Sequence, residues 1–184
     1  VRLQKEVGIT SIFVTHDQSE ALVMSDRIVV MDKAVIQQIG DPKSIYANPA
    51  NSFVANFIGV ANLFEGNLSD RKGKNATAKI DFGGDVGVKE LLANDVSNIP
   101  SNSKIYLCIR PEDMELSAKK FSGELAKNSI TGKVIETVYL GNFLECRVKI
   151  GNYEMIIQLD HFEQLKKGQS VNVSFKAAHG LLLS

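Results

Sequence analysis

The stretch "ITSIFVTHDQSEAL", residues 9–22, joins a short apolar run to a pattern with helical spacing. Residues 12–14 are apolar without a break, which predicts a strand buried on both faces of a parallel sheet, although so short a run is ambiguous by itself. Asp17 then offers a carboxylate as a helix N-cap, and Glu20 stands three positions later, as in a capping box. His16 is therefore predicted at a strand-to-helix turn.

That position is one where ligands gather in α/β proteins. Ligands collect beyond the carboxyl ends of the strands, where helix N-termini offer unpaired N–H groups to anions. Thr15, His16 and Asp17 occupy this place. An imidazole there could donate a hydrogen bond to a phosphate oxygen and stabilise developing charge. A single histidine at a strand end is more often a structural residue, so the residues alone leave both interpretations open.

The rest of the first third also alternates helix and strand patterns. Residues 1–7 are typical of a helix end, and Gly8 suits the left-handed position after it. The helix opened by Asp17 is expected to end near Met24. Residues 27–32 and 35–40 predict two strands that could pair as a hairpin. The joint between them, Lys33-Ala34, lacks the residue best suited to positive φ, so we expect a longer or differently built turn.

Two short helices are predicted next. Asp41-Pro42 opens the first, which runs through Tyr46, since proline fits the first helical position. Asn48-Pro49 ends it. In the second, Phe53 and Phe57 recur at one-turn spacing and form an apolar face before Gly59.

Beyond Gly59 the pattern changes to short runs that alternate apolar and polar residues, with turn residues at the joints. We therefore expect an α/β part over residues 1–60 and an all-β part over residues 61–184. Seven strands suggest a small barrel or sandwich, and residues 93–103 read as a polar loop. The seven predicted strands cover residues 62–68, 76–82, 104–116, 130–141, 143–150, 153–159 and 170–175.

Composition narrows the classes of function. The 184 residues hold 21 Lys plus Arg and 21 Asp plus Glu, so no global field draws the chain to nucleic acid or an anionic membrane. Only 7% of residues are aromatic, which also disfavours a nucleic-acid site. Apolar runs fall far short of the roughly 20 residues that span a bilayer. Cys108 and Cys146 lie singly in strand-like runs, which favours buried thiols in a reducing, cytoplasmic setting.

Residues 8–59, with the core "VTHDQSEAL", closely resemble the end of the nucleotide-binding domain of ABC import ATPases, in the group that serves sugars, polyamines, ferric iron and sulfate. The resemblance implies that His16 is the switch histidine, a catalytic residue that contacts the ATP γ-phosphate. It gives Thr15 and Asp17 a supporting role in the nucleotide loop. The fold it implies is a remnant of a P-loop NTPase-type domain.

From Ala61 onward the chain resembles the OB-like TOBE module attached to these ATPases. The motifs that carry this resemblance are "IRPEDMEL", residues 109–116, and "GKVIETVYLGN", residues 132–142. Arg110 and Glu112 in the first motif suggest a ligand site. A structural interpretation is favoured, because Pro111 stiffens a strand corner that neighbouring charged residues fix by local hydrogen bonds.

The sequence contains no G-x-x-x-x-G-K-[ST] phosphate loop. The resemblance implies ATP and magnesium as cofactors of a longer protein, whereas none is expected to bind these 184 residues, which should not hydrolyse ATP alone. No metal ligands are assigned. The chain opens on Val1 within a helical pattern, so we expect it to be the tail of a longer polypeptide.

The implied partners are a second ATPase subunit in a homodimer, membrane permease subunits and a solute-binding protein, with no nucleic acid. The implied location is the cytoplasmic face of the membrane. The solute stays open among polyamines, ferric iron and sugars. The alternative is a stand-alone OB-like module that binds a small ligand, regulates or dimerises.

Overall fold

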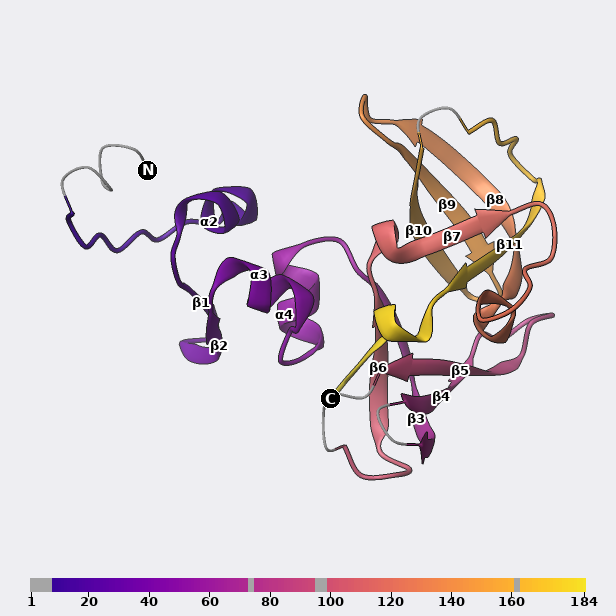
Figure 1. The fold of residues 1–184 in the computed structure, drawn as a ribbon, viewed down its shortest axis with the longest axis horizontal. Coiled ribbons are helices and arrows are strands. Elements are labelled where there is room, and N and C mark those ends of the chain that lie inside the picture. The colour runs from indigo at the N-terminus through magenta and orange to yellow at the C-terminus, as the bar shows by residue number, and fades with distance from the viewer. Residues whose placement is uncertain (1–7, 73–74, 95–98, 161–162) are drawn as a thin grey trace. The chain divides into compact units, whose positions relative to one another are not determined.

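The computed structural model of the protein describes residues 8–72, 75–94, 99–160 and 163–184 (Figure 1). The chain divides into two compact units, Val1–Gly59 and Val60–Ser184, called unit 1 and unit 2 below. The helix predicted over residues 1–7 lies outside the described residues. Gly8, which follows it, has the expected left-handed conformation with φ +68°.

Unit 1 is a small α/β assembly whose apolar core is formed by few residues. Its elements are α2 (Gln18–Met24), β1 (Ile28–Asp32), β2 (Val35–Gly40), α3 (Pro42–Ala47) and α4 (Ser52–Ile58). Its buried core consists of Ile28, Val30, Ile45, Val54 and Ile58. The helices begin where the sequence offers caps: Asp41 accepts a hydrogen bond from the Ser44 N–H at 2.9 Å, and Asn51 accepts one from the Val54 N–H at 2.9 Å.

The strand predicted over residues 12–14 is wrong. These residues form no strand, and Ile12, Phe13 and Val14 are 93%, 70% and 90% exposed. A strand buried in a parallel sheet needs neighbours on both sides to accept its backbone hydrogen bonds. The sheet of unit 1 contains only β1 and β2 among the described residues, and they pair with each other. The parallel sheet of a P-loop remnant is therefore not observed.

The hairpin predicted from residues 27–32 and 35–40 is confirmed, with β1 and β2 antiparallel from Ile28↔Gly40 to Asp32↔Val35. The expectation for its turn is wrong. The turn holds only Lys33 and Ala34, and both adopt positive φ, +48° and +63°. Two-residue turns of this kind match the twist of paired strands, and the chain accepts the conformational cost without glycine. One face stays exposed, since Val29 and Met31 are each about half exposed.

Unit 2 contains a closed five-stranded barrel with the strand order β12-β5-β4-β3-β6 (Figure 1). Its strands are β3 (Asn62–Lys72), β4 (Asn75–Asp81), β5 (Val88–Asn94), β6 (Lys104–Ile109) and β12 (Leu181–Leu183). The short β12 closes the barrel by pairing antiparallel with β6 and parallel with β5. Closure leaves few strand edges free to pair with other chains.

The second sheet of unit 2 is open and has the order β10-β9-β8-β11-β7. Its strands are β7 (Met114–Ser117), β8 (Ile130–Tyr139), β9 (Leu144–Ile150), β10 (Tyr153–Leu159) and β11 (Ser170–Phe175). In the described part of unit 2, three short 3₁₀ helices join elements: η1 (Pro111–Asp113), η2 (Leu125–Asn128) and η3 (Ala177–His179). One continuous core of buried side chains is drawn from both sheets.

The all-β, OB-like character predicted for this part is confirmed, but the number and grouping of strands differ. The run predicted as one strand over residues 104–116 is two strands in different sheets, because the chain turns at Pro111. β5 and β12 were not predicted. Ala93 and Asn94, the first two residues of the expected loop, belong to β5 instead, and residues 95–98 of that loop lie outside the described residues. In the described part of the chain, no helix has the length and hydrophobicity that crossing a bilayer requires.

Candidate functional site

His16 lies immediately before α2, on an exposed segment of unit 1. Within the described residues, no side chain is hydrogen-bonded or ion-paired to its imidazole. An exposed imidazole is available to donate to a ligand oxygen.

Asp17 caps α2 as the sequence predicts. Its Oδ1 accepts hydrogen bonds from the N–H groups of Ser19 at 2.8 Å and Glu20 at 3.2 Å, and from the Ser19 hydroxyl. The Ser19 hydroxyl and these N–H groups hold the pKa of Asp17 below its usual value, because they stabilise the carboxylate. The Asp17 carboxylate is thus engaged in capping the N-terminus of α2.

Thr15 and Glu20 form a contact that the capping-box prediction does not contain. The Thr15 hydroxyl donates to Glu20 Oε2 at 2.9 Å and accepts from the Asp17 N–H at 2.9 Å. In a capping box, the Glu20 carboxylate would instead accept a hydrogen bond from the backbone N–H of the cap residue, Asp17. These bonds anchor the residues on either side of His16 and limit the backbone freedom of the turn.

The segment around His16 offers an exposed imidazole and no cluster of metal-binding side chains among its described residues. No group of three or more His, Cys, Asp or Glu side chains suited to a metal ion occurs among the residues that the structure describes. The imidazole of His16 is one hydrogen-bond donor that an anion can approach, and the sequence contains no G-x-x-x-x-G-K-[ST] phosphate loop.

Arg110 and Glu112 lie at the corner between β6 and η1 and have different environments. Arg110 is only 6% exposed, and its Nη1 donates to the Val60 carbonyl at 3.1 Å. Glu112 is exposed. The burial of Arg110 and its bond to the backbone favour the structural interpretation of this corner over a ligand site.

Next to this corner, an aspartate of η1 is paired with a histidine of η3. His179 Nδ1 lies 3.1 Å from Asp113 Oδ1, which links η3 to η1. Burial raises the pKa of Asp113, and the neighbouring His179 opposes that effect.

Two buried asparagines join the barrel to the open sheet. The Asn62 side chain, on β3, donates to the Ile156 carbonyl at 2.8 Å and accepts from the Ile156 N–H at 2.8 Å, as a backbone amide would. Asn128 makes the same pair of bonds with Leu92 of β5, at 2.9 and 2.8 Å, and a third with the Phe175 carbonyl at 3.1 Å. Sequence reasoning did not single out either residue.

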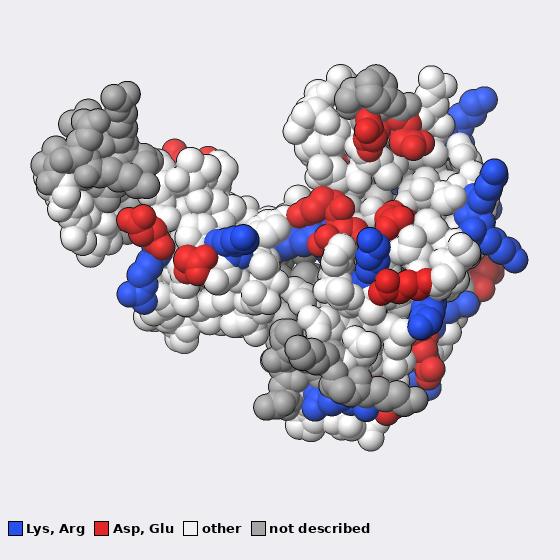
Figure 2. Space-filling model, in the orientation of Figure 1, with Lys and Arg blue, Asp and Glu red and all other residues white. Residues whose placement is uncertain are grey.

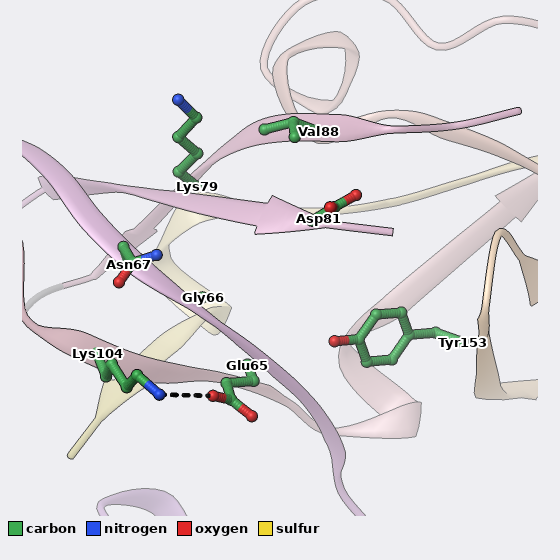
Figure 3. Close-up of a pocket in the computed structure, with 8 residues that line it drawn as sticks. All are labelled: Glu65, Gly66, Asn67, Lys79, Asp81, Val88, Lys104 and Tyr153. Atoms are coloured by element: carbon green, nitrogen blue, oxygen red, sulfur yellow. Dashed lines mark ion pairs between the residues drawn. The ribbon is translucent and has the colours of Figure 1, made fainter. Parts of the chain in front are cut away.

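A hollow of about 320 Å³ opens on the surface of unit 2 (Figure 3). It is bounded by residues of β3, β4, β5, β6 and β10: Glu65, Gly66, Asn67, Lys79, Asp81, Val88, Lys104 and Tyr153. Lys104 Nζ lies 3.7 Å from Glu65 Oε1 in an exposed ion pair. Sequence reasoning missed this site, although polar residues at alternating positions on β3 and β4 mark a solvent-facing side.

Positive and negative side chains are mixed on the face of the molecule seen in Figure 2, with no large area of one sign. This distribution agrees with the equal numbers of basic and acidic residues in the sequence. It gives no support to a nucleic-acid surface on this face, because such surfaces gather basic residues into one patch.

The β motifs of unit 2 match a known family. Residues 107–183 match the family model described as the TOBE domain. The matched range includes β7 to β11, the pair formed by Asp113 and His179, and all of β12.

Over most of its length the chain is similar to ATP-binding proteins of import systems. It is 33% identical to the spermidine/putrescine import ATP-binding protein PotA of Marinobacter nauticus, over 95% of this chain and 46% of that protein. It is 39% identical to the protein of the same name in Clostridium acetobutylicum, over 93% of this chain and 43% of that protein. The chain therefore spans about half the length of the curated relatives it matches.

A solved structure shares the fold. The cytoplasmic molybdate-binding protein ModG, in a form with molybdate bound, superposes with a TM-score of 0.54 over 66% of this chain and 94% of that protein. The identity is 19%, so this likeness shows the fold alone.

Proposed function

We propose that this chain is the C-terminal part of the ATP-hydrolysing subunit of an ABC importer, and that polyamines are the imported solutes. The observation that carries the proposal is the 33–39% identity, over nearly the whole chain, to proteins named for ATP binding in spermidine and putrescine import. The match to the TOBE domain supports the same assignment.

In this proposal His16 donates a hydrogen bond from its imidazole to the γ-phosphate of ATP held by the upstream part of the protein. Supporting observations are the exposed ring and the bonds of Thr15 and Asp17, which anchor the backbone on either side of it. ATP with magnesium supplies the phosphoryl group whose transfer to water drives transport. The residues of this chain contribute one donor and its orientation, and the phosphate loop would come from outside these 184 residues.

The proposed partners follow from the same assignment. A second copy of the subunit pairs with the first, permease subunits cross the membrane, and a solute-binding protein delivers the polyamine. The subunit acts on the cytoplasmic face of the membrane. Unit 2 adds surface to this assembly without contributing to the chemistry.

The test uses the full-length protein with its permease partners. His16→Ala is expected to lower ATP turnover by roughly 100-fold or more, since removing one donor to a transition-state oxyanion costs about that factor. ATP binding should persist. The control is His179→Ala, which removes an imidazole from unit 2 and should leave turnover within about twofold. Undiminished turnover in His16→Ala would refute the role given to this residue.

The solute is tested separately by uptake of radiolabelled spermidine into vesicles that contain the complete transporter. ATP-dependent uptake of spermidine, blocked by excess putrescine but not by ferric citrate or maltose, is expected. If spermidine does not stimulate turnover while a sugar or ferric iron does, the ATPase assignment stands and the polyamine assignment fails.

The second candidate is a stand-alone small-ligand module, which the hollow of unit 2 favours. It predicts a ligand-binding protein with no ATPase activity in its full-length form. Measurable ATP turnover by the full-length protein would exclude this candidate.

A further inference from the structure

The hollow of unit 2 has an uneven distribution of charge. On one side, Lys104, Asn67 and Lys79 lie in one row across three strands, because Asn67 of β3 pairs with Lys104 of β6 and with Lys79 of β4. Side chains directly opposite each other on paired strands are neighbours on one face of a sheet. In this cationic row, one lysine stands on each side of Asn67; Glu90 of β5, which does not line the hollow, is the strand partner of Lys79 on its other side.

On the other side of the hollow are two carboxylates. Glu65 is two residues from Asn67 on β3, and Asp81 is two residues from Lys79 on β4. Along the strands, the carboxylate residues therefore lie about 6.6 Å from the cationic row. Since Gly66 pairs with Ile80, the antiparallel register brings Glu65 across from Asp81. Figure 3 shows the hydroxyl of Tyr153 directed toward this acidic side.

Several polar groups of the hollow are left without partners inside the protein. Among the described residues, the ammonium of Lys79, the side-chain amide of Asn67 and the hydroxyl of Tyr153 make no hydrogen bond or ion pair. Asp81 is oriented by one bond, from the Gly83 N–H to its Oδ1 at 2.9 Å. These groups are ready to exchange water for a ligand.

The ion pair between Lys104 and Glu65 does not prevent a ligand from reaching the hollow. Lys104 and Glu65 are 85% and 56% exposed at 3.7 Å, and exposed pairs of this kind contribute little free energy. Val88, which pairs with Asp81, is half exposed and offers apolar surface beside the charged groups.

We propose that this hollow binds a small zwitterion whose ammonium and carboxylate groups stand at opposite ends of a short apolar chain. The carboxylate accepts hydrogen bonds from Lys79, Asn67 and Lys104, and the ammonium donates to Glu65, Asp81 and the Tyr153 hydroxyl. The methylene groups between them contact Val88. A simple anion or cation satisfies only one side, because two basic and two acidic residues line the hollow.

The probe is δ-aminovalerate, a five-carbon chain with an ammonium at one end and a carboxylate at the other. Its matched controls are cadaverine, which replaces the carboxylate by a second ammonium, and glutarate, which replaces the ammonium by a second carboxylate. Titrations of the 184-residue chain are followed by isothermal calorimetry and by NMR shifts of the amides of β3 and β4. We expect saturable binding of δ-aminovalerate, with cadaverine and glutarate each weaker by about tenfold or more, since each loses charge-assisted hydrogen bonds.

Two variants locate the site. Lys79→Met and Asp81→Asn should each weaken binding by about tenfold or more. The matched controls Lys133→Met and Glu136→Gln change exposed charges on β8 and should leave binding unchanged. Equal or tighter binding of cadaverine or glutarate would overturn the proposal. So would an absence of δ-aminovalerate binding, or binding that both site variants leave intact. None of these outcomes bears on ATP turnover, so this test is independent of the proposed function.

Discussion

At the scale of single residues, the side chains of two buried asparagines in unit 2 make the hydrogen bonds that a neighbouring strand would otherwise make with the backbone of Ile156 and Leu92. Asn62 satisfies both backbone groups of Ile156 in the open sheet, and Asn128 satisfies both backbone groups of Leu92 in the barrel. A buried amide that makes three hydrogen bonds restricts the positions of the neighbouring backbone more than an apolar side chain could.

Asn62→Ala is expected to lower the free energy of unfolding of unit 2 by about 2–4 kcal/mol, because it leaves the N–H and carbonyl of Ile156 without their partner. Urea denaturation followed by circular dichroism measures this loss. Asn172→Ala, which removes an exposed hydrogen bond to Thr131, is the control and should cost less than about 1 kcal/mol. Equal losses in the two variants would contradict the bridging role of Asn62.

The two cysteines are free and buried, and burial raises the pKa of each thiol from 9.0 to about 11. A raised pKa in the folded state means that the neutral thiols contribute stability below pH 9 and lose it as the pH rises toward 11. Wild-type stability should therefore fall between pH 9 and 11 more steeply than that of a Cys108→Ala/Cys146→Ala variant. Parallel pH profiles of the two proteins would contradict this assignment.

Capping could be predicted from the sequence because it is local. Asp17 and Asp41, where two of the predicted helices begin, each bond to an N–H within three positions of themselves, so sequence neighbours suffice. The role of Asn62 could not be predicted, since its partners Met114 and Ile156 are distant in sequence. The nucleotide contact proposed for His16 likewise depends on groups outside these residues.

At the scale of elements, the hairpin turn of unit 1 is the clearest local conflict between residue type and conformation. Lys33 and Ala34 both adopt the left-handed region, which costs residues with a Cβ about 1–2 kcal/mol each. The pairing of β1 with β2 and the burial of Ile28 and Val30 hold the turn in place.

Ala34→Gly should stabilise unit 1 by up to about 1 kcal/mol, because glycine adopts φ +63° without steric penalty. Hydrogen exchange of the amides of β1 and β2 measures the gain. The same substitution in α3, Ala47→Gly, is the control with the opposite sign, since glycine weakens helices. Slower exchange in Ala47→Gly than in Ala34→Gly would refute the strain at the turn.

Elements were predicted well where pattern and propensity agree. The helices α3 and α4, the hairpin and the alternating strands β8 to β11 follow their sequence patterns. β5 was missed because it contains Glu, Leu and Ala, which favour helices, and β12 because it has three residues. The strand at residues 12–14 failed because an apolar run is a strand only where another strand lies beside it.

At the scale of the whole molecule, the two units differ in how much apolar surface they bury. The core of unit 2 extends through the barrel and the open sheet, and three aromatic rings, Phe64, Phe82 and Tyr153, contact one another with centroids 5.3–5.5 Å apart. The core of unit 1 is small, and Ile12, Phe13 and Val14 are exposed and do not belong to it. Small cores rarely support independent folding.

Residues 60–184 expressed alone should therefore unfold in one cooperative thermal transition, whereas residues 8–59 alone should show none. Circular dichroism at increasing temperature distinguishes the two outcomes. A cooperative transition in residues 8–59 would show that their short core suffices, contrary to this expectation.

The barrel of unit 2 can close only after β12 has been synthesised. β5 and β6 are made early in the synthesis of unit 2, yet the strand that lies between them comes from residues 181–183. A growing chain must hold two unpaired strand edges until those residues leave the ribosome, and long-range pairings of this kind form slowly. During that interval the free edges of β5 and β6 are open to pairing with strands of other nascent chains. By covering both edges, Leu181–Leu183 protect the barrel from aggregation.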